Sequence, residues 1–174
     1  TNDSTPDYTF SSSEAGTITY GGSCSSSTTS ATTDNNTITL VSLSEGTYSD
    51  CTITVTDNSS NSVTLNMSSF VIDTTAPSIG GCEVTHPTND NTPDFIISSS
   101  EAGTITYGGS CSSSTTSATA GTITVTLYSL SDGTYSNCTI TVTDYAGNVS
   151  TTFSINAFII TRVLEITQTR GNDG

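Results

Sequence analysis

Residues Gly46–Asp57 have the sequence GTYSDCTITVTD, and residues Gly133–Asp144 have the sequence GTYSNCTITVTD. Within these stretches, apolar residues alternate with threonine over Cys51–Val55 and again over Cys138–Val142. A period of two is typical of a strand that buries one face and leaves the other face in water. Each of the two stretches therefore predicts one half-buried strand.

The duplication extends outward from these strands. Ser11–Ser30 returns letter for letter as Ser98–Ser117, which sets an offset of 87 residues (98 minus 11). Thr1–Asp7 returns with changes as Thr88–Asp94, and the offset holds until a one-residue insertion just after Asn148. The chain is thus predicted to contain two tandem copies of one small domain, each of ordinary domain size.

Each copy contains further short apolar runs with turn residues between them. We expect strands at these positions: Tyr8–Phe10, Gly16–Tyr20, Thr37–Leu40 and Val63–Met67 in the first copy, and Phe95–Ile97, Gly103–Tyr107, Thr122–Leu127 and Phe153–Ile155 in the second. Six or seven strands at spacings of about 8–12 residues indicate an all-β antiparallel sandwich. A small barrel is the alternative.

Composition excludes several classes of protein. Of 174 residues, 38 are Thr and 31 are Ser, which disfavours a helical fold. Sixteen acidic residues face two basic ones, giving a net charge of −14, and nucleic-acid binding needs the opposite balance. No apolar run approaches the roughly 18 residues that would span a bilayer.

Three motifs together resemble the tandem bacterial Ig-like repeats of large secreted adhesins. They are the GTYS(D/N)CTITVTD stretch, the linker Asp73–Pro77 (DTTAP), and the turn Asp144–Asn148 (DYAGN). The resemblance covers nearly the whole chain and implies two Ig-like sandwiches in an extracellular surface fibre. The first copy departs from the pattern at Asp57–Asn61, where the family has an Ala-Gly turn.

The cysteines repeat with the domains. Cys24 and Cys51 recur as Cys111 and Cys138, whereas Cys82 has no counterpart. Matched pairs in an extracellular β domain favour one disulfide per copy, Cys24–Cys51 and Cys111–Cys138. Free buried thiols and a metal site are the alternatives, although no CxxC spacing is present. Cys82 is expected either to pair outside this chain or to remain reduced.

Carboxylates are the other candidate chemistry, and the first 161 residues hold 14 of them without one basic residue. Calcium takes six to eight oxygen ligands in flexible geometry, and the resemblance implies calcium at some junctions between repeats. The candidate ligands are Asp57, Asp73, Asp90, Asp94 and Asp144. The alternative is that these aspartates cap turns. No other cofactor is expected.

No catalytic constellation is visible. His86 has no counterpart in the first copy, and the serine runs lack a general base. We therefore expect a non-enzymatic structural module of an extracellular bacterial fibre or adhesin stalk. The alternative is a carbohydrate-binding or accessory module, in which Tyr20 and Tyr107 would be the residues to test.

The last thirteen residues resemble the start of a repeat. Leu164 falls where Cys82 is, and Ile166 falls where Val84 is. We therefore divide the chain into a first repeat (1–73) that lacks its first strand, a second repeat (78–161), and a tail (162–174) that supplies such a strand. The tail is predicted to insert into the first repeat of another copy, head to tail. The alternative is that the chain is a segment of a longer array of such repeats, which would have the same ends and neighbouring Ig-like repeats as partners. The expected interface residues are Arg162, Val163, Leu164, Ile166 and Arg170.

Overall fold

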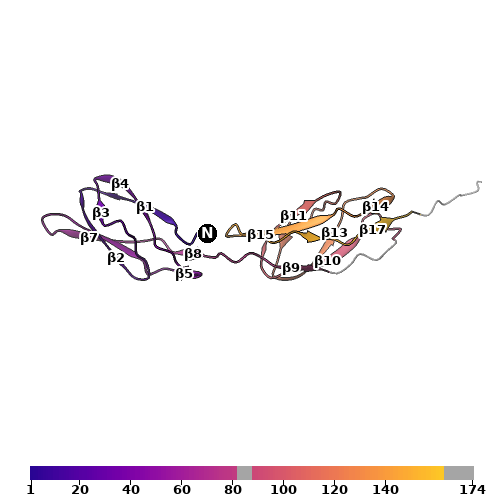
Figure 1. The fold of residues 1–174 in the computed structure, drawn as a ribbon, viewed down its shortest axis with the longest axis horizontal. Helices are drawn as coiled ribbons and strands as arrows, with labels where there is room; N and C mark the ends of the chain where they lie inside the picture. The colour runs from indigo at the N-terminus through magenta and orange to yellow at the C-terminus, as the bar shows by residue number, and fades with distance from the viewer. Residues whose placement is uncertain (82–87, 163–174) are drawn as a thin grey trace, which may run out of the picture. The chain divides into compact units, whose positions relative to one another are not determined.

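The computed structural model describes residues 1–81 and 88–162, and all regular secondary structure in them is β-strand. None of these residues forms a helix that could cross a membrane. The chain divides into two compact units, one built on Thr1–Thr75 and the other beginning at Ala76. Figure 1 shows each unit as a separate set of packed strands.

The first repeat is a sandwich of eight strands. They are β1 (Asp7–Ser12), β2 (Gly16–Gly21), β3 (Ser30–Ala31), β4 (Asp34–Thr39), β5 (Gly46–Tyr48), β6 (Thr52–Thr56), β7 (Ser62–Asn66) and β8 (Phe70–Ile72). Antiparallel pairing gives a four-stranded sheet in the order β3-β2-β6-β7 and two ribbons, β1-β4 and β5-β8.

The second repeat has the same plan with one more strand. Its strands are β9 (Ile79–Gly81), β10 (Asp94–Ser99), β11 (Gly103–Gly108), β12 (Ser117–Ala118), β13 (Gly121–Thr126), β14 (Gly133–Tyr135), β15 (Thr139–Asp144), β16 (Phe153–Ser154) and β17 (Phe158–Ile160). The four-stranded sheet has the order β12-β11-β15-β16, and β14 pairs with β17. The remaining sheet, β13-β10-β9, has three strands where the first repeat has two.

Alternation along the strands builds the core of each repeat. Ile53 and Ile18 are buried between the layers, while the threonines between such residues lie on the outer face. On that face, the hydroxyls of Thr54 and Thr64 lie 2.7 Å apart across β6 and β7. The predicted all-β sandwich fold is confirmed, and β-branched residues on both faces explain why the strands form.

Aromatic pairs fix the last strand of each repeat. Tyr48 stacks on Phe70 with ring centroids 5.4 Å apart, and Tyr135 stacks on Phe158 at 5.2 Å. These pairs join β5 to β8 and β14 to β17. The strands expected at Val63–Met67 and Phe153–Ile155 are present as β7 and β16, and the shorter strands β8 and β17, of three residues each, follow them and close the repeats.

Glycine is required at the turn before each first cysteine. Gly22 and Gly109 have φ of 71° and 72°, and a Cβ on Gly109 would collide with the carbonyl group of Asn137. Only glycine adopts this conformation without steric cost. The turn brings Cys24 to Cys51 and Cys111 to Cys138, and these partners directly precede β6 and β15.

Candidate functional site

Disulfides close both repeats in the same way. Cys24 is bonded to Cys51 and Cys111 to Cys138, each pair with Cα atoms 5.3 Å apart and 27 residues apart in sequence. All four cysteines are buried in the two cores. Their sulfur atoms are therefore unavailable as metal ligands. Cys82 and His86 lie outside the described residues.

Asp57 serves the hairpin turn between β6 and β7. Its Oδ1 accepts hydrogen bonds from the backbone N–H groups of Ser59 and Asn61, at 2.7 and 2.8 Å, and its Oδ2 accepts one from the Asn61 side chain at 2.8 Å. These bonds, above all those from Asn61, lower the pKa of Asp57. This is the turn-capping role that small acidic side chains often take.

Two further candidate ligands also hold the backbone in place. Asp90 Oδ1 accepts from the N–H and the hydroxyl of Thr92 at 2.8 and 3.0 Å, and Asp94 Oδ1 accepts from the hydroxyl of Thr126 at 2.5 Å. Asp3 and Asp7 repeat both arrangements in the first repeat. Five of the aspartates at loop ends thus have structural hydrogen bonds.

Asp73 and Asp144 are the remaining members of the predicted calcium set. Asp73 Oδ1 accepts from the N–H of Thr75 at 3.2 Å. Asp144 is only 8% exposed, and within the second repeat its carboxylate lies within 4.8 Å of that of Glu101. Calcium binding stays a prediction for these positions, and titration calorimetry with CaCl₂ would test it.

The tyrosines expected of a carbohydrate-binding module do not form an exposed platform. Tyr20 and Tyr107 are half-buried against their cores, and their hydroxyls donate to the carbonyl groups of Thr28 and Thr115 at 2.5 Å. Burial raises the pKa of Tyr107. These side chains pack within the repeats and have little surface left for a sugar ring.

Arg162, a predicted interface residue, is bound within its own repeat. Its Nε lies 2.6 Å from Asp132 Oδ1, and its backbone N–H donates to the other carboxylate oxygen at 3.4 Å. The other predicted interface residues, Val163, Leu164, Ile166 and Arg170, lie outside the described residues.

The most distinctive surface of the first repeat is the outer edge of β1. Within the described part of the chain, β1 pairs only with β4, from Asp7 opposite Thr39 to Ser12 opposite Asp34. The equivalent strand β10 is paired on both sides, because β9 adds to its outer edge with Ile97 opposite Gly81 and Ser99 opposite Ile79. The edge that β9 covers in the second repeat is therefore open in the first.

This open edge uncovers part of the inner face of the opposite sheet. Val63 and Leu65 pair with Val55 and Ile53, and Ile53 is 1% exposed, so all four side chains lie on the inner face. Nevertheless, Val63 is 69% exposed and Leu65 is 43% exposed. Nothing among the described residues of the opposite layer covers them.

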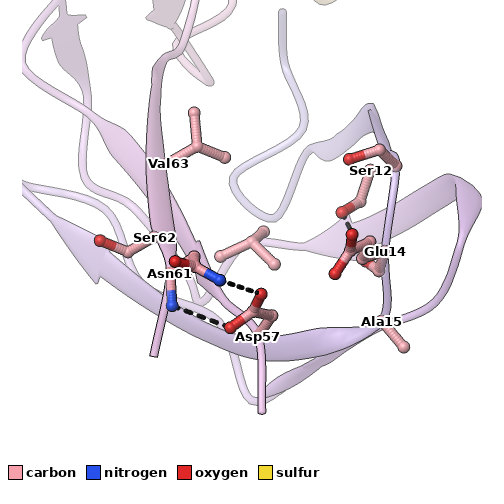
Figure 2. A pocket seen from close by; sticks show the side chains of 9 residues that line it. Ser12, Glu14, Ala15, Asp57, Asn61, Ser62 and Val63 are labelled. Carbon is pink, nitrogen blue, oxygen red and sulfur yellow. Dashed lines mark hydrogen bonds between the residues drawn. The ribbon is translucent and has the colours of Figure 1, made fainter. Parts of the chain in front are cut away.

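Two adjoining hollows mark this seam, each with a volume of about 240 Å³. They share four lining residues, Ser12, Ser13, Val55 and Val63, and so form one groove between β1 and β7. Figure 2 shows one end of it, where Asp57 bonded to Asn61 lies across from Glu14. The groove is apolar along its floor and acidic at this end.

This groove was not among the predicted sites, although the sequence pattern contains a signal for it. Val63 and Leu65 have the spacing of inner-face residues, and among the described residues β1 pairs with β4 alone.

The second repeat, residues 77–160, matches the family model of the bacterial Ig-like domain. This repeat is therefore a bacterial Ig-like domain, and the resemblance inferred from the sequence motifs is confirmed. The first repeat has nearly the same sequence and the same strand plan.

Two solved structures align with the chain. The fibronectin(III)-like modules of Clostridium thermocellum CbhA align over 95% of this chain and 91% of their own, with 11% identity and a TM-score of 0.46. The D0-D1 domain of intimin aligns over 89% and 92%, with 20% identity and a TM-score of 0.29. Similarities this distant say nothing about function. No curated protein matches the chain.

Proposed function

We propose that this chain is a structural segment of an extracellular bacterial fibre or adhesin stalk, without enzymatic activity. The observation that carries the proposal is the tandem repetition of nearly identical sandwiches, each closed by its own disulfide. A duplicated module adds length and mechanical continuity, whereas a catalytic site needs to be made only once. Disulfides persist in the oxidising surroundings of secreted and cell-surface proteins.

The proposal includes how the segments join. The tail of one copy (162–174) inserts into the first repeat of the next copy and adds a strand there. Such a contact is head to tail and does not close on itself, so it generates a filament. The charges support it, because residues 1–75 contain eight acidic residues and no basic one, whereas the tail contains Arg170 in addition to Arg162, which is paired with Asp132 of its own repeat.

Sedimentation velocity and negative-stain microscopy of the purified chain test the assembly. The full chain should form filaments, and a chain ending at Arg162 should remain monomeric with an unchanged second repeat. Filaments that persist without residues 163–174 would refute insertion of the tail, and leave the chain as a plain segment of a stalk.

A glycan array tests the class of protein. We expect no strong binding to any glycan. Strong binding that is lost in Tyr20→Ala or Tyr107→Ala would replace the structural role with a carbohydrate-binding one.

A further inference from the structure

We propose that the groove between β1 and β7 of the first repeat is the acceptor for residues 163–169 of a second copy. The added segment lies antiparallel to β1, as β9 lies against β10 in the second repeat. This inference rests on the head-to-tail assembly proposed above, and it adds the surface, the direction and the contacts.

Backbone N–H and C=O groups of β1 face the open edge, where an added strand could bind them. The N–H of Leu40 donates to the carbonyl of Pro6 at 3.1 Å, so the even-numbered residues of β1 exchange hydrogen bonds with β4. The N–H and C=O groups of Thr9 and Ser11 therefore point to the open edge, since these groups alternate along an antiparallel strand. Unpaired edges of this kind pair readily with another strand.

The second repeat shows how this edge is used. The N–H of Ser100 donates to the carbonyl of Ser78 at 3.0 Å, which places the same alternate set of β10 groups toward β9. Ser98 is the equivalent of Ser11, at the offset of 87 residues. The equivalent strands β1 and β10 thus pair in the same register with β4 and β13. β10 also pairs with β9, whereas the other edge of β1 is open among the described residues.

The side chains in the groove need a cover. In the second repeat, Gly81 of β9 lies against Phe153, which occupies the position of Leu65, and Ile79 packs against the core. In the first repeat Leu65 is smaller than Phe153 and leaves more room above it. An added strand there needs apolar side chains rather than glycine to fill the space.

Residues 163–169 provide that chemistry. Leu164 and Ile166 are two residues apart, so a strand presents both to one face, while Glu165 and Thr167 face the other way. We therefore place Leu164 and Ile166 over Val63 and Leu65.

Charge favours the same partner. Glu14 and Asp57 line one end of the groove, and the acceptor repeat contains no basic residue with which to neutralise them. The tail carries Arg170, one of the two basic residues of the chain. Because the added strand runs antiparallel to β1, Arg170 lies toward the start of β1, on the side of Asp7, and not at the end of the groove where Glu14 and Asp57 lie. A second copy thus brings the cation that the first repeat lacks.

Complementation between two full-length variants tests the proposal. Ser11→Pro removes an N–H that faces the open edge, so it should block the groove without disturbing β4, and proline is tolerated at such edge positions. Leu164→Asp/Ile166→Asp should disable the tail but leave the groove intact. Each variant alone should be monomeric, and a mixture of the two should give a 1:1 dimer and nothing longer.

Matched controls keep the result specific. Ser11→Ala retains the N–H, and Glu165→Gln changes the opposite face of the added strand, so both should assemble like the unmodified chain. Far-ultraviolet circular dichroism and thermal melting should show that Ser11→Pro is folded. Filaments formed by folded Ser11→Pro would overturn the acceptor groove, while head-to-tail assembly itself would stand.

A peptide separates the two proposals if the full chain does not assemble. A peptide of residues 163–174 is titrated into the Leu164→Asp/Ile166→Asp chain, and the amides of Thr9 and Ser11 are followed by NMR. We expect protection of both amides and affinity weakened about tenfold or more by adding Ser11→Pro, the loss expected for one hydrogen bond. Absence of binding would refute the groove, whereas binding without filaments would refute only the polymerisation.

Discussion

Arg162 Nε lies 2.6 Å from Asp132 Oδ1, at the point where the second repeat ends. The first repeat makes the equivalent contact with different chemistry. There, Glu45 Oε1 accepts hydrogen bonds from the hydroxyls of Thr74 and Thr75, at 2.8 and 2.5 Å. In both repeats a carboxylate directly before a short strand, Glu45 before β5 or Asp132 before β14, binds the residues that follow the last strand. The second residue after each closing strand, Thr74 or Arg162, thereby binds to its own sandwich.

The Glu45 contact predicts an acid-sensitive first repeat. The hydroxyl of Thr75, followed by the hydroxyl and N–H of Thr74, lowers the pKa of Glu45 below its ordinary value. A lowered pKa contributes stability that is complete above the unfolded-state value of about 4 and is lost as the pH falls through the folded-state value. We expect Glu45→Gln to reduce the dependence of thermal stability on pH between about pH 5 and pH 2. Glu14→Gln, which removes the same charge elsewhere in the repeat, should keep that dependence, and equal pH profiles for the two variants would contradict the prediction.

Reduction should destabilise both repeats. On the chain-entropy estimate, a disulfide that closes a loop of 27 residues contributes roughly 3–4 kcal/mol. Calorimetry should therefore show a melting temperature lower by several degrees or more after reduction. Intact mass should rise by about four hydrogens for the two pairs. A mass unchanged by reduction under denaturing conditions would be incompatible with the disulfides.

The Asp57 turn predicts a local effect in the first repeat. Asp57→Ala removes three hydrogen bonds to Ser59 and Asn61, so the β6–β7 hairpin should lose order and the first repeat should melt at a lower temperature. Asn58→Ala, at an exposed neighbouring position, should change little. Hydrogen exchange at Ser62–Asn66 gives the measurement, and unchanged protection in Asp57→Ala would count against the turn-capping role.

Gly81 predicts a steric effect that depends on its partner. A Cβ on Gly81 would lie 2.8 Å from Phe153 Cζ, so Gly81→Ala should destabilise the second repeat, by about 1–3 kcal/mol for overpacking of this kind. Phe153→Leu, which installs the residue of the first repeat, should relieve most of that cost in the double variant. Gly80→Ala is the control, because its Cβ would meet only the Ser98 hydroxyl oxygen, at 2.9 Å. Denaturant unfolding measures all four chains, and additive effects of Gly81→Ala and Phe153→Leu would exclude the contact.

Much of the fold follows from local sequence patterns. The alternation of Cys51–Val55 predicts β6, and the repeated cysteines predict the pairs that the structure contains. These features are predictable because strand periodicity and duplication are properties of neighbouring residues.

The remaining features depend on residues far apart in sequence. β8 has three residues and is held by the stacking of Phe70 on Tyr48, which local periodicity does not contain. The exposure of Val63 depends on which strands lie opposite β7, and the ion pair of Arg162 depends on a loop 30 residues earlier. Aspartates present a related difficulty, because turn capping and calcium binding use the same side chains.

The disulfides also set how far each repeat can lengthen under load. When the two ends of a repeat are pulled apart, the 27-residue loop between its cysteines stays closed by a covalent bond. At about 3.4 Å per extended residue, each loop withholds roughly 90 Å of contour length from an unfolded repeat. An unfolded repeat of the oxidised chain therefore extends less than an unfolded repeat of the reduced chain, and reduction would increase the length that each unfolding event releases.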